Sequence, residues 1–452
     1  MSGRFFVHTF GCQMNVHDSD RMQDVLVAHG WTAAPSVAAA DLVVFNTCSV
    51  RETAENKLRI EVDKLRPVKR ARPSLLIAVA GCVAQQEGER LLKEMPAIDL
   101  VIGPDNIPEL PALLGDQLGG APPLSRTVFD VEAPRFLAAA PRPGQAPISA
   151  YVTTMKGCDE RCSFCVVPYT RGPERYRSSE EIVAEIAALC EAGAREVTLL
   201  GQTVNSYRDP LGALPRAEGA DPQDPDESEF AALLRRIAAD VPALRRLRYT
   251  SPHPRHLTPS LVRAHAELAL LPRHVHLPVQ SGSNRILKRM IRRYTREEYL
   301  SRTRALCEAA PGMTLSTDII VGFPGETEED FDQLIQFLED AKLDRVGAFA
   351  YSPVEGAKAN ELGELLPEDV REDRRRWLMQ VQEDISAEKL AAKIDTVIEV
   401  LVDEVDEEGT IARSKADAPE IDGLVYLDGH FDAQPGDFLQ VKVIDADHHD
   451  LY

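Results

Sequence analysis

The stretch Lys156-Gly-Cys-Asp-Glu-Arg-Cys-Ser-Phe-Cys-Val-Val-Pro-Tyr-Thr-Arg171 places three cysteines in the spacing C-x3-C-x2-C. Thiolates are soft ligands that select zinc, copper(I) or iron–sulfur clusters. A structural zinc site takes four protein ligands, and no fourth Cys or His lies within twenty residues before Cys158 or after Cys165. Three ligands, Cys158, Cys162 and Cys165, therefore indicate a [4Fe-4S] cluster with one iron open to a cofactor or substrate. A zinc site completed from elsewhere, or three thiols on a mobile loop, is the alternative.

The composition predicts a cytoplasmic globular protein with two or three domains. At 452 residues, 44% of them hydrophobic and 27% charged, the chain exceeds what one hydrophobic core normally supports. The first ten residues lack the pattern of a signal peptide, and no run of about 18 apolar residues offers a membrane span. Eight cysteines are too few for a disulfide scaffold in a chain of this length, and metal-bound thiolates need reducing conditions.

Charge is unevenly distributed along the chain. The formal net charge of -21 argues against nonspecific affinity for nucleic acid. Residues 393–452 hold 16 Asp and Glu against 4 Lys and Arg, a net charge of -12. By contrast, residues 284–304 contain eight basic side chains, which either neutralise RNA phosphates or form a solvated helical face.

The N-terminal third repeats a strand–cysteine–helix pattern three times. The predicted strands are residues 4–10, 41–45 and 75–80. Helical stretches follow at about 18–29 and 52–65, and a third follows the Gly81-Cys82 turn and ends at about 94. This alternation is typical of a parallel sheet, whose right-handed crossovers bring the strand ends to one edge. Cys12, Cys48 and Cys82 each follow a strand and precede a helix N-terminus, which favours the thiolate. They predict a second three-ligand cluster; small residues filling tight turns are the alternative.

The middle of the chain predicts six more strands, after a Pro-, Ala- and Gly-rich connector at 104–147. These strands are residues 151–155, 196–201, 246–250, 274–278, 314–321 and 345–351, too few for a closed eight-stranded barrel. Polar and glycine residues follow the strands, where barrel enzymes place their sites; the candidates are Gly201, Gln202, Ser251, Gln280 and Gly322. His253 is either a general base or a turn histidine, and residues 209–229 predict a surface insertion.

The C-terminal part predicts a charged helix and a small β-barrel. The helix covers about 367–390, with Trp377, Leu378 and Val381 expected to be buried. Three strands are predicted at 397–402, 423–427 and 437–444.

The two cysteine sets together resemble the methylthiotransferase family of radical S-adenosylmethionine enzymes. The resemblance rests on the cysteine loop and on Gly11-Cys-Gln-Met-Asn15, Asn46-Thr-Cys-Ser-Val-Arg51 and Gly81-Cys-Val-Ala-Gln85. It implies an α/β architecture with three domains: an N-terminal methylthiotransferase domain with an auxiliary cluster at 1–140, a partial (β/α)6 barrel at 141–382 and a TRAM β-barrel at 383–452. It also implies two [4Fe-4S] clusters, S-adenosylmethionine, an electron donor such as flavodoxin or ferredoxin, no membrane partner, and a monomer.

The resemblance divides between two substrate branches. Residues 165–172, 199–205 and 276–282 look like the branch that adds a methylthio group to C2 of N6-isopentenyladenosine at position 37 of tRNA. Residues 344–356 and 416–423 look like the sister branch that modifies an aspartate of a small-subunit ribosomal protein, and the acidic C-terminal segment agrees with this second branch. Function belongs to the catalytic site rather than to an appended module, so we expect the tRNA substrate.

The resemblance implies roles for single residues and for the clusters. Cys158, Cys162 and Cys165 would hold the catalytic cluster, while the Cys12, Cys48 and Cys82 cluster would hold or donate sulfur. Gly201 and Gln202 would meet the methionine part of the cofactor, Gly322 its adenosine, and Ser251 and Gln280 would complete the rim. An alternative of another class is an RNA-binding scaffold with two structural metal sites, which predicts a zinc protein without turnover.

Overall fold

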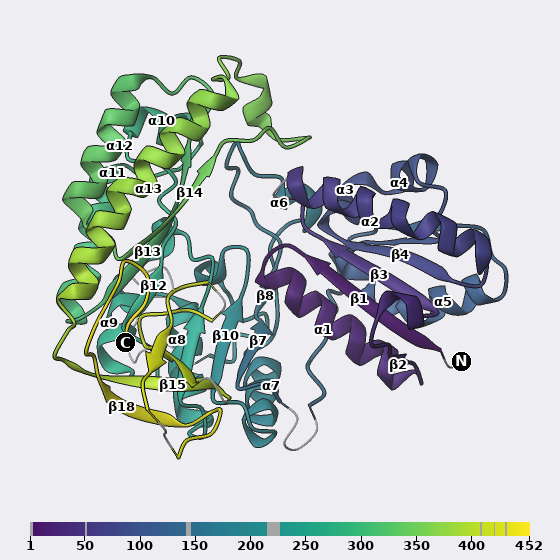
Figure 1. Cartoon of the computed structure of the whole chain (residues 1–452), viewed down its shortest axis with the longest axis horizontal. Helices are drawn as coiled ribbons and strands as arrows, with labels where there is room; N and C mark the ends of the chain where they lie inside the picture. The colour runs from purple at the N-terminus through teal and green to yellow at the C-terminus, as the bar shows by residue number, and fades with distance from the viewer. Residues whose placement is uncertain are drawn as a thin grey trace. The chain divides into compact units, whose positions relative to one another are not determined.

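The computed structural model describes residues 3–49, 52–141, 146–214, 227–406, 409–419, 421–429 and 432–452, without the side chains of 52–54. Much of the insertion predicted at 209–229 lies outside the described residues, at 215–226. The chain forms two compact units (Figure 1). Unit 1 comprises Met1–Ala140, Tyr151–Arg177 and Ser352–Lys358, and unit 2 comprises Pro141–Ala150, Ser178–Tyr351 and Ala359–Tyr452. Every helix in the described part of the chain is too short or too polar to span a bilayer.

Unit 1 is built on a parallel six-stranded sheet in the order β2-β1-β3-β4-β5-β6. The strands are β1 (Arg4–Phe10), β2 (Thr32–Ala33), β3 (Leu42–Thr47), β4 (Leu76–Gly81), β5 (Leu100–Ile102) and β6 (Leu124–Arg126). Helices α1 (Gln13–Ala28) and α5 (Leu110–Leu118) pack on one face, and α2 (Glu52–Ala71), α3 (Cys82–Glu87) and α4 (Glu89–Glu94) pack on the other (Figure 1). Because both faces are covered, β3 and β4 are buried along their whole length, which explains their unbroken apolar sequences.

The prediction of a connector at 104–147 is wrong for its first part. Residues 104–126 hold the 3-10 helix η2 (Pro104–Glu109), helix α5 and strand β6, which complete the sheet and its cover. Ile107, Leu110 and Leu114 are buried against the sheet, so a few apolar side chains outweigh the Pro-rich composition. The third predicted helix is divided into α3 and α4 at Gly88, which has a φ of 51°. A further 3-10 turn, η1, covers Val37–Ala39.

The six predicted barrel strands are all present, in two three-stranded sheets ordered β11-β10-β7 and β12-β13-β14. They are β7 (Ser149–Thr153), β10 (Glu196–Leu200), β11 (Arg246–Tyr249), β12 (His274–His276), β13 (Thr314–Val321) and β14 (Arg345–Ala350). The pairs β10–β11, β12–β13 and β13–β14 are parallel. These pairings confirm the partial (β/α)6 barrel.

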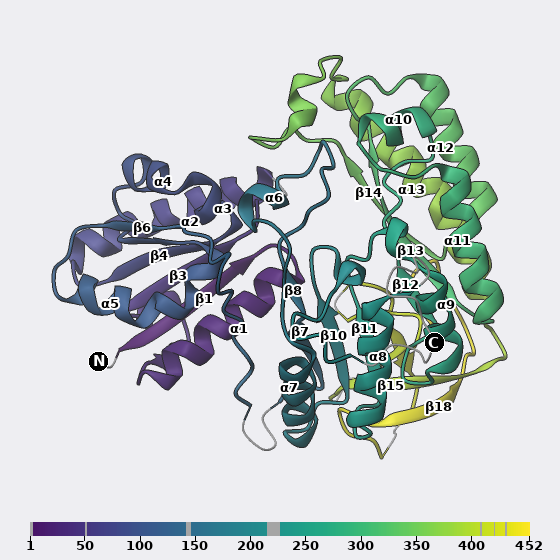
Figure 2. The same cartoon turned by 180° about the vertical axis from the view of Figure 1, so that it is seen from behind.

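Helices lie outside the barrel strands (Figure 2). They are α7 (Ser179–Glu191), α8 (Glu229–Asp240), α9 (Pro259–Glu267), α10 (Asn284–Arg289), α11 (Arg296–Ala309), α12 (Glu328–Ala341) and α13 (Glu368–Ala391). The short 3-10 turns η3 (Val204–Ser206), η4 (Pro254–His256) and η5 (Lys358–Glu361) lie in loops. Ser178, Ser228, Thr258, Thr295 and Thr327 accept hydrogen bonds from backbone N–H groups at five of the helix starts.

The C-terminal part forms a four-stranded antiparallel sheet ordered β17-β16-β15-β18, in agreement with the predicted small barrel. Its strands are β15 (Val397–Val405), β16 (Thr410–Ser414), β17 (Val425–Leu427) and β18 (Phe438–Lys442). β16 was not predicted because Thr410-Ile-Ala-Arg-Ser414 has one large apolar residue. The sheet closes over a small core of Val400, Val402, Ala412, Val425 and Leu451.

A buried ion cluster joins this sheet to the barrel strands of unit 2. Glu196 on β10 accepts hydrogen bonds from Arg248 on β11 at 2.6 Å and lies 2.8 Å from Nη1 of Arg413 on β16. Arg413 also contacts Asp403 on β15, at 2.6 Å. A carboxylate buried in this way stays charged only because several guanidinium groups surround it, and they lower the pKa of Glu196 to about 2 although burial opposes the shift.

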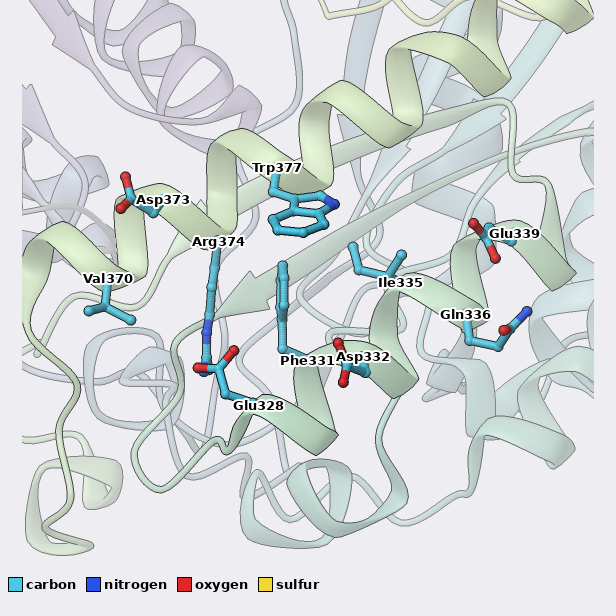
Figure 3. A pocket seen from close by; sticks show the side chains of 10 residues that line it. All are labelled: Glu328, Phe331, Asp332, Ile335, Gln336, Glu339, Val370, Asp373, Arg374 and Trp377. Atoms are coloured by element: carbon cyan, nitrogen blue, oxygen red, sulfur yellow. The ribbon is translucent and has the colours of Figure 1, made fainter.

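The prediction that Trp377 is buried needs correction. Trp377 on α13 is 62% exposed, whereas its neighbour Leu378 is buried. Adjacent helical residues point about 100° apart, so only one of the two faces the core. The Trp377 ring packs edge-on against Phe331 of α12, 6.3 Å between centroids, and lines a groove of about 380 Å³ (Figure 3).

Three arginines of the basic run at 284–304 are paired within unit 2, which weakens the RNA interpretation, while the solvated helical face stays a prediction. Arg285 forms an ion pair with Asp330, Arg289 with Glu364 at 3.1 Å, and Arg296 with Asp340 at 3.3 Å. These arginines bind carboxylates within unit 2, so they are less available to RNA phosphates than the sequence indicates.

Candidate active site

The three N-terminal cysteines lie at one edge of the unit 1 sheet, as the crossover argument predicts. The register pairs Phe10 with Thr47 and Thr47 with Gly81 at the carboxyl ends of β1, β3 and β4. Cys48 and Cys82 directly follow their strands, and Cys12 follows β1 by two residues. Cys12 is the N-cap residue of α1, and Cys82 is the first residue of α3.

Glycines allow the strand ends to come this close. Gly11 and Gly81 have φ values of 139° and 94°, a region that side chains rarely adopt. A Cβ atom on Gly11 would collide with the Cβ atom of Cys48, and one on Gly81 would collide with the Asn46 side chain. The Gly-Cys pairs in the sequence therefore reflect crowding around the cysteines.

A buried amide pair fixes the first two cysteine turns to each other. Asn15 Nδ2 donates to Asn46 Oδ1 at 3.1 Å, and Asn46 Nδ2 donates to the Asn15 carbonyl at 2.7 Å. The Cys12 thiol in turn donates to Asn15 Oδ1 at 3.3 Å. Both amides are fully buried, so the two turns are held as one rigid rim.

The environment favours the thiolate form of Cys12. A hydrogen bond with Cys48 contributes most to lowering the pKa of Cys12 to about 6, and the backbone N–H of Asn15 and the charge of Arg171 add to it. A metal needs deprotonated thiols. The lowered pKa of Cys12 therefore favours the thiolate, the form in which a cysteine binds a metal.

The second triplet lies on a closed loop, also in unit 1. Strands β8 (Met155–Lys156) and β9 (Arg175–Tyr176) pair antiparallel at its base, and helix α6 (Val167–Thr170) follows its last cysteine. The backbone N–H of Cys158 donates to the Gly172 carbonyl at 3.1 Å, and that of Cys165 donates to the Cys162 carbonyl at 3.1 Å. The Val167 N–H donates to the Cys165 sulfur at 3.4 Å.

Buried charges fasten this loop to the N-terminal sheet. Asp105 on η2 accepts a hydrogen bond from Lys156 at 3.3 Å and forms an ion pair with Arg175. α6 packs against α3, the helix that begins at Cys82. The chain therefore holds both cysteine triplets in one compact unit.

Arg171 links the loop to the first triplet directly. Its Nε donates to the Cys82 sulfur at 3.2 Å, and its Nη2 lies 2.6 Å from Asp18 Oδ2. Burial alone would raise the pKa of Asp18, but Arg171 and His17 outweigh it and lower that pKa to about 2. Asp18 and Arg171 are thus a charged pair inside the protein, beside the thiol of Cys82.

The donor sets fit iron–sulfur clusters. All eight cysteines lie in the described part of the chain, and none of them forms a disulfide. Six of them form two groups of three, the number that leaves one iron of a [4Fe-4S] cluster open. Cys190 and Cys307 lie instead on α7 and α11, where burial raises the pKa of each thiol.

The five predicted cofactor residues lie in unit 2 at the carboxyl ends of strands. Gly201 and Gln202 follow β10, Ser251 follows β11, and Gly322 follows β13. The Val204 N–H donates to the Ser251 carbonyl at 3.3 Å, which joins the first two loops. Gln280 hydrogen-bonds Asp318 and Ile320 of β13 through its backbone. The loops after β10 and β11 are therefore neighbours, and the segment around Gln280 lies beside β13, which Gly322 follows.

Backbone geometry separates Ser251 and Gln280 from ordinary turn residues. Their φ values are 58° and 75°. A left-handed backbone conformation is uncommon in residues other than glycine, and such residues cluster at functional sites. For Gly322, with φ at 66°, the space a Cβ would need is filled by the Arg371 stem. Packing therefore accounts for this glycine, and its contact with adenosine stays a prediction.

His253 occupies a structural position. Its Nδ1 accepts a hydrogen bond from the Arg255 N–H at 3.1 Å, which caps η4, and its backbone forms two hydrogen bonds with the Asn205 side chain. The structure thus places His253 in a turn, and its role as a general base stays a prediction.

Sequence reasoning missed the polar residues that hold the two triplets together. They are Asn15, Asp18, Asn46, Asp105, Lys156, Arg171 and Arg175. Asn15, Asn46 and Arg171 stand inside or at the end of the cysteine motifs, which is a signal that could have found them. Asp105 carries no such signal because it lies in the segment taken for a connector.

Three family models match the chain. Residues 4–103 match a family described as Uncharacterized protein family UPF0004, residues 152–338 match the Radical SAM superfamily, and residues 394–452 match the TRAM domain. Membership of the radical SAM superfamily implies a [4Fe-4S] cluster and S-adenosylmethionine.

Solved structures at low sequence identity share the fold. The cobalamin-dependent S-adenosylmethionine radical enzyme OxsB is 13% identical with a TM-score of 0.52, over 84% of this chain and 56% of that one. The radical S-adenosylmethionine methyltransferase TsrM from Kitasatospora setae is 15% identical with a TM-score of 0.52, over 78% and 77% of the two chains.

Relatives at high identity match over nearly the whole chain. A tRNA-2-methylthio-N(6)-dimethylallyladenosine synthase of Sorangium cellulosum is 59% identical over 99% of this chain and 92% of its own. A ribosomal protein uS12 methylthiotransferase RimO of Dechloromonas aromatica is 47% identical over 98% of this chain and 96% of its own. A tRNA-2-methylthio-N(6)-dimethylallyladenosine synthase of Myxococcus xanthus is 42% identical over 97% of this chain and 91% of its own. With these relatives and the three matched domains, the chain belongs to the radical S-adenosylmethionine methylthiotransferases, a family of sulfur-inserting enzymes.

Proposed function

We propose that this enzyme inserts a methylthio group at C2 of N6-isopentenyladenosine at position 37 of tRNA. The observation that carries the proposal is the 59% identity to a synthase named for this reaction over 99% of the chain. The motifs at 165–172, 199–205 and 276–282, which resemble the tRNA-modifying branch, support it because they include part of the cysteine loop and the barrel rim. Family membership also speaks against an RNA-binding scaffold with structural metals.

The cluster assignment is part of the proposal. Cys158, Cys162 and Cys165 hold the [4Fe-4S] cluster that binds S-adenosylmethionine, and Cys12, Cys48 and Cys82 hold a second one. When bound, these groups supply a reducing electron, a hydrogen-abstracting 5'-deoxyadenosyl radical and the methylthio group. Fully reconstituted protein should then contain about eight irons per chain.

The protein residues position the reacting groups. The β8–β9 hairpin and the Asp105 contacts fix the loop triplet, while the Asn15–Asn46 pair fixes the N-terminal one. Gly201, Gln202, Ser251, Gln280 and Gly322 bind the cofactor at the barrel rim. This division of work is usual for enzymes whose cofactor carries the difficult chemistry.

The domain division, partners and location complete the proposal. The N-terminal domain covers 1–140, the partial barrel 141–382 and the TRAM domain 383–452; the family matches at 4–103, 152–338 and 394–452 are compatible with these bounds. A flavodoxin or ferredoxin supplies electrons to a monomeric enzyme. A cytoplasmic location follows from the tRNA substrate and from the reducing conditions that thiolate ligands need.

A second substrate has its own support. The ribosomal protein uS12 methylthiotransferase of Dechloromonas aromatica is more similar to this chain, at 47%, than the tRNA synthase of Myxococcus xanthus, at 42%. The net charge of -12 on residues 393–452 suits a basic protein better than a polyanion. Methylthiolation of a ribosomal-protein aspartate is therefore the alternative.

One experiment separates the two substrates. The chain is expressed in cells that lack both methylthiotransferases, and tRNA nucleosides and ribosomal proteins are analysed by mass spectrometry. We expect methylthiolated isopentenyladenosine with the wild-type chain and none with Cys162→Ala. Methylthiolated aspartate without the modified nucleoside would overturn the tRNA proposal in favour of the alternative.

A further inference from the structure

Arg171 belongs to one cysteine triplet by sequence and to the other by contact. It lies six residues after Cys165, at the end of the loop motif, yet its Nε donates to the sulfur of Cys82 at 3.2 Å. Its side chain is 4% exposed. A charged group so deeply buried is costly unless it is fully paired, so the contacts of its five N–H donors are informative.

The protein satisfies only part of this guanidinium. Nε binds Cys82, and Nη2 lies 2.6 Å from the carboxylate of Asp18. Nη1 and Nη2 are both buried, and among the described residues neither makes a hydrogen bond, so Nη2 has only its ion pair with Asp18 and Nη1 has no polar partner. A buried donor without a partner is costly, and such a donor beside a thiol at the proposed cluster indicates that an anionic ligand accepts its hydrogen bond.

We propose that Arg171 is the positioning residue for sulfur at the N-terminal triplet: it donates to the ligand Cys82 and to a soft sulfur anion, hydrosulfide or an alkyl thiolate, held there. This inference rests on the proposed function, because it requires a cluster at Cys12, Cys48 and Cys82. Hydrogen bonds to cluster sulfur and a nearby positive charge stabilise the more reduced, more negative state. Arg171 therefore binds the anion and raises the reduction potential of this cluster.

Arg175 provides a matched comparison on the same segment. It is buried like Arg171, but it donates to oxygens: the Asp105 carboxylate and the carbonyls of Asp130, Pro173 and Arg171. A guanidinium that only fastens the loop has this pattern. The thiol contact and the unfilled Nη1 distinguish Arg171 from it.

The test isolates the N-terminal cluster in a Cys162→Ala background, in which the loop cluster cannot form. Arg171→Gln, Arg171→Lys and the control Arg59→Gln are reconstituted anaerobically as full-length protein. Arg59 lies on α2, and its ion pairs with Glu55 and Glu94 involve neither cysteine triplet. Iron content, the midpoint potential and the electron paramagnetic resonance response to titrated sodium sulfide are measured for each variant.

We expect Arg171→Gln to keep its iron, to have a more negative midpoint potential and to bind sulfide at least about tenfold more weakly, equivalent to about 1.4 kcal/mol. Arg171→Lys keeps the charge but not the planar donor set, and it should also bind sulfide more weakly. If the Gln variant does not fold, the sulfide affinity of the Lys variant tests the inference. Arg59→Gln should leave the midpoint potential and the sulfide affinity unchanged.

Two results would overturn the inference in distinguishable ways. If either folded Arg171 variant retains iron and binds sulfide like its parent at an unchanged potential, Arg171 is only a structural ion-pair partner and the proposed function survives. If the Cys162→Ala parent holds no iron at all, the second cluster of the proposed function fails, and the inference fails with it.

Discussion

The two cysteine triplets of unit 1 are built in opposite ways. Cys158, Cys162 and Cys165 share one short loop, closed by backbone hydrogen bonds within the loop and to Gly172. Cys12, Cys48 and Cys82 come from three separate strand ends and meet only because β1, β3 and β4 are in register. The first triplet depends on local sequence, whereas the second depends on a whole sheet, so the two should respond differently to mutation.

The largest expected effect comes from the loop. In Cys162→Ala, product formation should fall by more than about 1000-fold, a barrier increase above about 4 kcal/mol, because the cluster that cleaves S-adenosylmethionine cannot form. Iron should fall from about eight to about four per chain. Chromatographic assay of product and of 5'-deoxyadenosine checks this, and Cys190→Ala, which lies on α7, is the control that should retain both.

The corresponding change in the strand-end triplet should separate the two functions. Cys48→Ala should also reduce iron to about four per chain and abolish the methylthiolated product. Reductive formation of 5'-deoxyadenosine should continue, since the loop triplet is intact. If this variant loses 5'-deoxyadenosine formation as completely as Cys162→Ala does, the division of roles is wrong.

Glycines beside the cysteines allow a finer test of local against long-range construction. In Gly81→Ala the new Cβ meets Asn46 and Thr47, and in Gly157→Ala it meets the carbonyls of Gly172 and Pro173. Each change should lower iron occupancy several-fold at its own triplet only, measured by the spectroscopic signals of the two clusters.

Gly193→Ala is the matched control for these two variants. Gly193 has a φ of 119° but open space around its Cα, so it carries the conformational cost without the collision. Both iron signals should survive in this variant. Equal loss in all three variants would show that general destabilisation, rather than local crowding, empties the sites.

The smallest expected effect concerns acid stability. Asp18 has its pKa lowered from 3.8 to about 2 in the folded chain. Its carboxylate therefore stabilises the fold above about pH 4, and this contribution, about 2 kcal/mol, is lost as the pH falls towards 2. In urea unfolding of the metal-free protein, Asp18→Asn should remove this acid-dependent loss.

A surface carboxylate gives the comparison for Asp18. Asp373 forms an exposed pair with Arg376, and exposed pairs contribute little to stability. Asp373→Asn should therefore lose as much unfolding free energy at acid pH as the wild type does. If Asp18→Asn also loses as much unfolding free energy at acid pH as the wild type, the assignment of the lowered Asp18 pKa to the Arg171 pair is wrong.

The predictions from sequence succeeded where a pattern is short and repeated. All six barrel strands, the three N-terminal strand–cysteine turns and three of the four C-terminal strands were predicted from apolar runs. Failures came where packing overrode composition: the Pro-rich segment at 104–126 completes the sheet, and Trp377 points outwards beside the buried Leu378. Tertiary ion pairs likewise altered the interpretation of the basic run, because Asp330, Asp340 and Glu364 are distant from it in sequence.

The sequence by itself determined which cysteines we propose as ligands, since thiolate chemistry and the C-x3-C-x2-C spacing are local properties of the chain. It also determined the reaction class, through motifs that surround those cysteines. Only the tertiary structure decided that Arg171 contacts Cys82 rather than its own loop, that Asp105 holds the loop to the sheet, and that Asn15 meets Asn46. Such contacts join residues far apart in the sequence, and strand register and buried charge pairing, which no short pattern encodes, determine which of them form.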